Sequence, residues 1–401
     1  MTPSNSAEMP TRQSMPIGFG RLFCGAAGLA AMLVCAFVAP PVHAAEDADL
    51  FDFMVMNVCV DGSDQAIPGL SPISPDCKRQ RDIRETDAVP YHLTSFGQDA
   101  NKCPGHVTVN DNLPVTRNGV VRVVKTVRVD YQNCRPKNAP VPAYYSVRWF
   151  DDQFAFIMGA WSRGQDGGKV GGGITPQCEA AGDTSRTTSR RYFRNWVLFD
   201  RTTAASGKTG FEAFSKASAI HGLPALDSAC PAEYRARYLA VWTRGHYTYR
   251  SGASLETLIS HPYSQSDASG TTPAGGKQME RTYWTREFGQ SRWENWKRDD
   301  YTNKKSGETA VELAKATFSS GECGKPFAMV SEPTPGITLG PVEENGTYSQ
   351  TLTDRRTGQT HRWYMAGCQD ITNVVQPQNK NGDPYPDFSV INPKFWEFWS
   401  G

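Results

Sequence analysis

Short runs of β-branched and aromatic residues recur along the chain, and they predict a protein built mainly of strands. The clearest is Val120–Val129, which is β-branched almost throughout and follows the turn dipeptide Asn118-Gly119. Similar runs cover 144–150, 154–161 and 192–200. Because strands bounded by Gly/Pro-rich turns dominate, the pattern predicts a mainly β protein with a jelly-roll-like β-sandwich body.

Helical spacing is much rarer than strand spacing. Thr309–Phe318 fits one short helix, and Gly210–Ile220 fits another. Near the C-terminus, two further strand patterns flank the turn sequence D-R-R-T-G and predict a second hairpin over Thr347–Ala366. The expected fold therefore has few, short helices.

The mature chain divides by composition into three expected parts. Residues 45–140 form a small N-terminal β-rich module, 141–318 the main sandwich body, and 319–401 C-terminal strands and a tail that pack on the body. A proline-rich run, Arg135–Pro142, marks the first boundary.

The first 44 residues read as a signal peptide. Arg12 and Arg21 precede an apolar run, Leu22–Val38, which Pro40-Pro41 ends before a V-x-A cleavage site at Ala44. An uncleaved membrane anchor is the alternative, since the run is almost long enough to span a bilayer. We expect a secreted or periplasmic protein that is not membrane-embedded after processing.

Eight cysteines remain after the predicted cleavage, and an even number in an exported chain indicates disulfides. Local loop closure costs the least entropy. It favours the pairs Cys59–Cys77, Cys103–Cys134, Cys178–Cys230 and Cys323–Cys368, although spacing alone leaves other connectivities open.

Charge and motifs exclude several function classes. Lys+Arg 42 against Asp+Glu 41 leaves no basic excess for a nucleic-acid partner. The glycine-rich stretch Gly164–Gly173 lacks the phosphate-loop pattern, and no zinc or EF-hand motif occurs. We expect no cofactor, except that Asn379–Asp387 is rich in oxygen ligands and suits either Ca²⁺ or ordinary turns.

The stretch Glu280–Arg298 concentrates tryptophans, glutamates and arginines around Gly289. A two-residue turn at Gly289-Gln290 predicts a hairpin with Glu287 opposite Arg292. In that register Glu287 and Glu294 share one face and lie one step diagonal, which suits two carboxylates acting across a glycosidic bond.

The predicted site has a catalytic pair and a surrounding ligand-binding set. The catalytic candidates are Glu287 and Glu294, and flat rings and guanidinium groups beside them suit sugar rings and uronate carboxylates. The binding candidates are Tyr283, Trp284, Trp293, Trp296, Arg281, Arg292 and His261. The competing interpretation is a purely structural ladder of ion pairs on an aromatic-rich sheet.

These observations predict an exported, disulfide-bonded β-sandwich that handles an extracellular or cell-envelope polysaccharide. It either binds this glycan only or also cleaves it, as a glycoside hydrolase or polysaccharide lyase. The alternative is a non-catalytic envelope or adhesion protein whose aromatic surface binds another protein. The pattern specifies neither the glycan nor the oligomeric state.

The cysteine count makes a direct prediction about free thiols. If all eight mature cysteines are cross-linked, thiol titration of the denatured, unreduced protein will find essentially none. Two or more reactive thiols per chain would contradict it.

Overall fold

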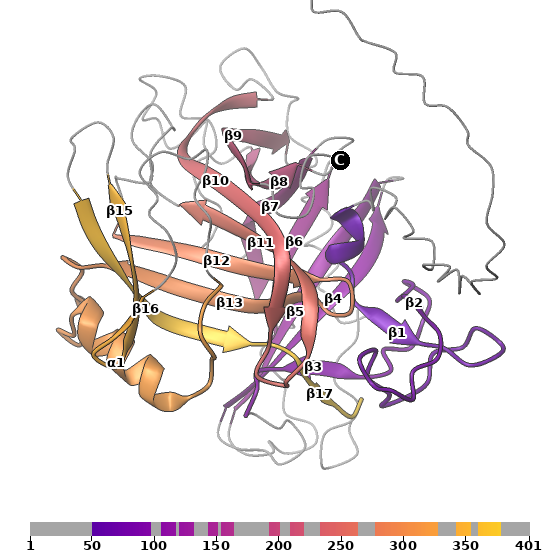
Figure 1. Cartoon of the computed structure of the whole chain (residues 1–401). Helices are drawn as coiled ribbons and strands as arrows, with labels where there is room; N and C mark the ends of the chain where they lie inside the picture. Colours follow the sequence, from indigo (N-terminus) through magenta and orange to yellow (C-terminus); the bar gives the residue numbers. More distant parts are fainter. Residues whose placement is uncertain are drawn as a thin grey trace, which may run out of the picture. The chain divides into compact units, whose positions relative to one another are not determined.

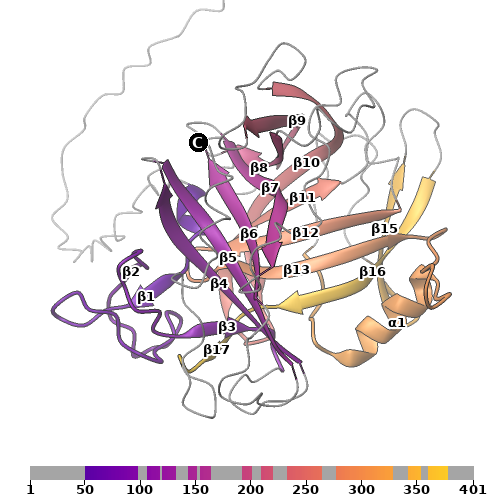
Figure 2. The same ribbon diagram turned by 180° about the vertical axis from the view of Figure 1, so that it is seen from behind.

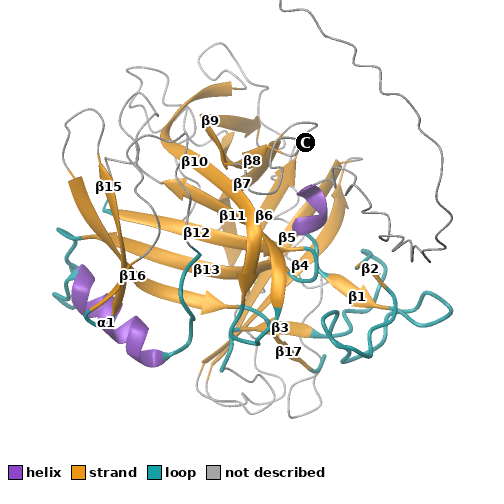
Figure 3. Ribbon diagram, in the orientation of Figure 1, coloured by secondary structure: helices purple, strands orange, loops and turns teal. Residues whose placement is uncertain are grey.

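The computed structural model describes residues 50–97, 106–117, 120–131, 143–150, 154–163, 192–200, 209–219, 233–263, 277–327, 342–353 and 360–377. All of them belong to the compact unit Asp47–Gly401, and the predicted signal peptide lies outside them. Strands dominate this part of the chain, together with one α-helix and one short 3₁₀ helix (Figures 1 and 3). A mainly β protein with few helices is therefore confirmed.

The elements follow in chain order. They are η1 (Leu50–Phe53), β1 (Asn57–Cys59), β2 (Gln80–Asp82), β3 (His92–Thr94), β4 (His106–Arg117), β5 (Val120–Tyr131), β6 (Ala143–Phe150), β7 (Phe154–Arg163), β8 (Tyr192–Asp200), β9 (Thr209–Ala219), β10 (Glu233–Thr248), β11 (Ser254–Tyr263), β12 (Gln278–Thr285), β13 (Gly289–Arg298), α1 (Ala310–Ser320), β14 (Val342–Glu344), β15 (Thr347–Thr353), β16 (Thr360–Asp370) and β17 (Asn373–Val375).

One antiparallel ladder contains all of these strands except β1 and β2, which pair with each other. From β3 to β13 each strand pairs with its neighbour in sequence, so this part is a succession of antiparallel neighbours. Strand β16 then pairs with β13, and β17, which begins three residues after β16 ends, pairs with β3. The sheet therefore curls, because one short stretch of chain pairs near both ends of the strand order (Figures 1 and 2).

The predicted β-sandwich is not confirmed by this arrangement. The described strands share one curled ladder beside a small two-stranded sheet, instead of dividing into two facing sheets. Strands from all three predicted parts of the mature chain join that ladder: β3–β5 come from 45–140, β6–β13 from 141–318 and β14–β17 from 319–401.

One of the two predicted helices is confirmed and the other is wrong. Helix α1 begins after Thr309, whose side chain and that of Glu312 form a capping box, and it ends at Gly321 in the left-handed conformation. The stretch predicted as a helix over Gly210–Ile220 is instead strand β9. Its backbone pairs with β8 on one side and β10 on the other, and this tertiary pairing outweighs its weak helical pattern.

The main apolar core lies where the N-terminal segment meets the strands. Phe53, Met54 and Met56 are fully buried there, together with Trp284 and Phe288 of the β12–β13 hairpin. Met56 also forms an isolated β-bridge with Phe288. The residues that begin the described chain thus pack directly on the end of this hairpin.

Two of the four predicted disulfides are present. Cys59–Cys77 has Cα atoms 5.5 Å apart and Cys323–Cys368 has them 6.1 Å apart. The pairs Cys103–Cys134 and Cys178–Cys230 lie outside the described residues and stay predictions. Disulfides suggest an oxidising compartment. In the described part of the chain, no helix has the length and apolar character that crossing a bilayer requires.

Gly289 gives a stability prediction with a built-in control. Its φ is +66°, and a Cβ there would lie 2.8 Å from Asn112 Cβ and 2.9 Å from the Met54 carbonyl oxygen. Gly252 also has positive φ, +84°, but a Cβ there would meet nothing within 4 Å. We expect Gly252→Ala to lower the free energy of unfolding by ~1–2 kcal/mol from backbone strain alone, and Gly289→Ala to lower it by more.

Urea denaturation of the two variants beside the wild type measures this difference. Equal losses for the two alanine variants would show that the close approach of Asn112 and Met54 to Gly289 does not constrain the fold.

Candidate functional site

The predicted hairpin is present as β12–β13, but the predicted turn and register are wrong. The turn contains Arg286, Glu287 and Phe288, and Thr285 pairs with Gly289. A three-residue loop followed by a left-handed glycine is a common hairpin geometry, and here it also buries Phe288 in the core. A further irregularity between Tyr283 and Trp284 shifts the pairing along the rest of the hairpin.

The observed register separates the two glutamates that were expected to work together. Glu287 lies in the turn, whereas Glu294 lies within β13 opposite Arg281. Tyr283 faces Arg292, and Trp296 faces Met279. The diagonal Glu287–Glu294 arrangement of the predicted register is therefore absent.

Glu294 is fully buried and held by internal partners. Its Oε1 accepts hydrogen bonds from Tyr283 Oη at 2.7 Å and Arg292 Nε at 2.8 Å. Its Oε2 accepts one from Trp296 Nε1 at 2.9 Å and lies 3.7 Å from Arg281 Nη1. All five side chains have 0% exposure. Hydrogen bonds and ion pairs of this kind offset the free-energy cost of burying a carboxylate, which is a structural role.

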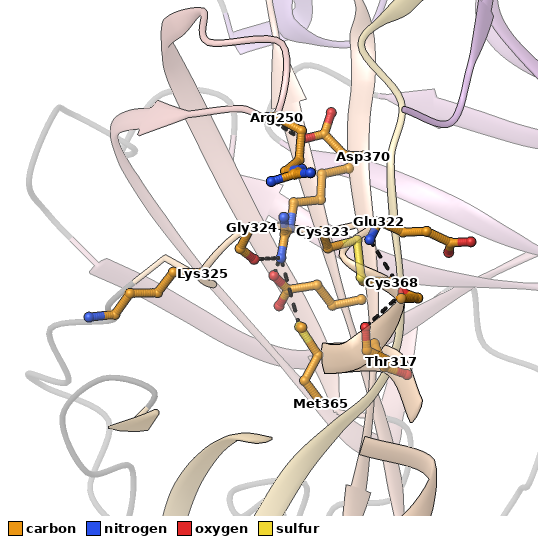
Figure 4. The surroundings of a disulfide bond; sticks show 12 residues. Arg250, Thr317, Glu322, Cys323, Gly324, Lys325, Met365, Cys368 and Asp370 are labelled. Atoms are coloured by element: carbon orange, nitrogen blue, oxygen red, sulfur yellow. Dashed lines mark hydrogen bonds and ion pairs between the residues drawn. A yellow bond between two sulfur atoms is a disulfide. The ribbon is translucent and has the colours of Figure 1, made fainter. Parts of the chain in front are cut away.

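A short covering segment, Cys323–Phe327, completes the burial of this network. The carbonyl oxygen of Gly324 accepts from Arg292 at 3.0 Å, and that of Phe327 accepts from Arg281 at 3.2 Å. The Phe327 backbone N–H donates to Tyr283 Oη at 3.0 Å. The Cys323–Cys368 disulfide ties the segment to β16, with the Lys325 side chain pointing away from it (Figure 4).

The remaining predicted binding residues are dispersed. Trp284 is fully buried, with the ring of Phe199 edge-on at 6.5 Å, and Trp293 is half-buried. His261 lies in β11 opposite Val241, and its side chain is outside the described part of the structure. The aromatic and arginine side chains at the centre of the hairpin thus belong to the interior in this conformation. They are Tyr283, Trp284, Trp296, Arg281 and Arg292.

A different group of titratable side chains gathers at the tip of the same hairpin. Glu287 is half-buried there, and its carbonyl oxygen accepts a hydrogen bond from the backbone N–H of Asn57 at 2.9 Å. Asn57 in turn pairs with Asp82 across the small β1–β2 sheet. Arg286, beside Glu287, interacts electrostatically with both carboxylates. We call Asp82, Arg286 and Glu287 the tip cluster.

Both carboxylates of the tip cluster hold their protons more tightly than usual. Burial, reinforced by the nearby Asp52 carboxylate, raises the pKa of Asp82 to about 6, although Arg286 partly opposes the shift. Burial also raises the pKa of Glu287, against hydrogen bonds that favour its ionised form. Carboxylates with raised pKa values near the protein surface are typical of acid–base sites.

Polar atoms without protein partners surround the same cluster. Asn57 Oδ1, Arg286 Nε and Glu287 Oε2 are buried and form no hydrogen bond within the structure described here. The guanidinium groups of Arg286 and Arg244 lie 5.2 and 5.4 Å from the ring centre of Phe53. The arrangement leaves two acceptor oxygens and one donor nitrogen without protein partners in the described part of the chain.

Sequence reasoning identified Glu287 but missed Asp82. The run Lys78–Glu85 is highly charged, with Ile83 its only apolar residue, and it resembles an ordinary polar loop. Only the pairing of β1 with β2 and the contact of Asn57 with the hairpin turn bring Asp82 close to Arg286. No local signal in the sequence encodes that approach.

No group of three or more His, Cys, Asp or Glu side chains suited to a metal ion occurs among the described residues. The oxygen-rich stretch Asn379–Asp387, which suited Ca²⁺ or ordinary turns, lies outside them. Comparison of the chain with protein-family models, curated protein sequences and solved structures finds no match.

The buried network predicts a large stability loss when its single carboxylate is neutralised. Glu294→Gln removes the carboxylate that pairs with both Arg281 and Arg292, and breaking a buried ion pair costs ~3–5 kcal/mol. Glu256→Gln removes the partner of Arg244 at a site where the glutamate is 31% exposed, so we expect ~1 kcal/mol or less. Chemical denaturation of both variants checks the difference, and similar losses would contradict a structural role for Glu294.

Proposed function

We propose that this protein binds an extracellular or cell-envelope polysaccharide at the tip cluster, and that Asp82 and Glu287 act there as an acid–base pair that cleaves it. The observation that carries the proposal is a pair of half-buried carboxylates, each with a raised pKa and each interacting electrostatically with Arg286. The two disulfides, which suggest an oxidising compartment, are compatible with an exported protein.

The proposed chemistry follows from the protonation states. With a pKa of about 6, a large part of the Asp82 population keeps its proton in mildly acidic solution and can protonate a glycosidic oxygen. Glu287 in its ionised form then serves as base or nucleophile, with its Oε2 free of protein hydrogen bonds. Most glycoside hydrolases divide these roles between two carboxyl groups.

Two arginines beside the cluster suit an acidic polymer, and the carboxylates of Asp52 and Glu256 also act on the cluster. Arg286 and Arg244 are half-buried beside the cluster, and guanidinium groups bind the carboxylates of uronate sugars well. This differs from the sequence-based prediction, in which Tyr283 and Trp296 stacked on the sugar. Both rings are fully buried and are not part of the proposed contact.

A non-catalytic protein that binds another protein is the second candidate. The burial of Tyr283, Trp284 and Trp296 favours it, because the aromatic side chains that made the hairpin resemble a glycan-binding surface instead form core. Under this alternative the tip cluster contacts a partner protein and performs no chemistry.

Oligosaccharide binding and product analysis distinguish the two candidates. The purified mature chain should bind acidic glycans on an array and release new reducing ends or unsaturated products from the bound polymer. Asp82→Asn should abolish turnover while leaving binding nearly intact, and Glu287→Gln should lower turnover at least 100-fold. Turnover by the wild type should fall as the pH rises through about 6, because Asp82 then loses its proton.

Asp87→Asn is the matched control, because Asp87 lies close to Asp82 in sequence but pairs with Arg81 at 2.6 Å outside the cluster. It should retain turnover. Full activity in Asp82→Asn and Glu287→Gln would refute the catalytic assignment, and no binding to any glycan would favour the protein-binding alternative.

A further inference from the structure

A second unusual polar group lies inside the curled sheet and forms no ion pair with a described carboxylate. Arg148 of β6 is 2% exposed, and its guanidinium group stacks over the ring of Trp284 with 4.8 Å between its Cζ and the ring centre. Its Nη2 donates to the neutral side-chain oxygen of Gln290. Three strands, β6, β12 and β13, therefore meet at this one cation.

Among the described residues, nothing compensates the charge of Arg148. Its Nε and Nη1 form no hydrogen bond, and no ion pair joins it to a described carboxylate. Two further polar atoms nearby are also buried without partners: the indole Nε1 of Trp284 and Oδ1 of Asn112, whose Nδ2 donates to the Phe288 carbonyl oxygen. Buried guanidinium groups ordinarily have anionic partners, because an unpaired ion in the interior is strongly unfavourable.

Loss of the proton does not remove this charge. Burial lowers the pKa of Arg148 to about 9, which is still well above neutral pH. The side chain therefore stays cationic under physiological conditions, in surroundings that include the apolar side chains of Phe199 and Trp284. A counter-ion from solution removes the imbalance without any change in the fold.

We propose that Arg148 and Trp284 form an internal binding site for a small monovalent anion, a halide or a short carboxylate. Arg148 supplies the charge and an unpartnered N–H donor, and Trp284 supplies a second donor and an apolar face. A single positive charge matches a monovalent ligand better than phosphate or sulfate. The site is independent of the tip cluster and of the function proposed for it.

An anion that binds only the folded state raises the melting temperature, so thermal unfolding tests the proposal without requiring an entry path. Sodium chloride and sodium acetate are titrated separately against sodium gluconate at constant ionic strength. We expect the melting temperature of the wild type to rise by several degrees and to saturate with at least one of the two small anions. The two titrations distinguish a halide site from a carboxylate site.

Arg148→Met keeps the length of the side chain and removes its charge. This variant should be at least as stable as the wild type in gluconate and should show no saturating response to chloride or acetate. Arg84→Met is the matched control, because Arg84 is 56% exposed and pairs with Asp64 on the surface. It should respond to the anions as the wild type does.

Identical responses of the wild type and Arg148→Met would overturn the proposal, as would a wild type that shows no saturating response to either anion. If Arg148→Met does not fold, Arg148→Lys, which keeps the charge, replaces it in the same titration. The lysine variant should still respond, with saturation at a higher anion concentration. If the wild type responds and a folded lysine variant does not respond at all, the positive charge at this position is not sufficient to bind the anion.

Discussion

The pairing of one buried glutamate with two buried arginines is the interaction on which the centre of the sheet depends. Arg281 and Arg292 project from adjacent strands, and neither is exposed to solvent. Glu294 pairs with both guanidinium groups, and Tyr283 and Trp296 provide its remaining hydrogen bonds. Because ionised groups are tolerated in an interior only when they are paired and hydrogen-bonded, these side chains also restrict which register the hairpin can adopt.

The covering segment Cys323–Phe327 extends the same constraint to the C-terminal part of the chain. It contributes main-chain atoms to the network, so its contacts depend on backbone position more than on side-chain identity. The Cys323–Cys368 disulfide keeps that backbone beside β16, which pairs with β13 along the other side of the hairpin. Packing, a covalent link and charge compensation therefore act on one small region.

Local sequence signals predicted the elements well and their environment poorly. The capping box of α1, the β-branched run of β5 and two short-range disulfides are encoded by residues close together in the chain. The predicted hairpin register is wrong because the cross-strand pairs that favour it are worth only ~0.2–1 kcal/mol each, and the burial of Phe288 outweighs them. The mixture of aromatic and charged side chains on the hairpin suggested a ligand-binding groove. These side chains instead form an interior network that the covering segment Cys323–Phe327 buries. Asp82 had no sequence signal, since its approach to Arg286 depends on long-range pairing.

The position of β17 has a consequence for how the chain folds. Most of the ladder consists of neighbours in sequence, which can pair as soon as they are formed. The contact between β17 and β3 instead joins residues from opposite ends of the described chain, and it places Val374 opposite Leu93. Pairings of such long sequence separation are slow to form because loop-closure entropy opposes them. We therefore expect this short strand to dock late in folding, and until it does, β3 has an open edge to which another chain can add.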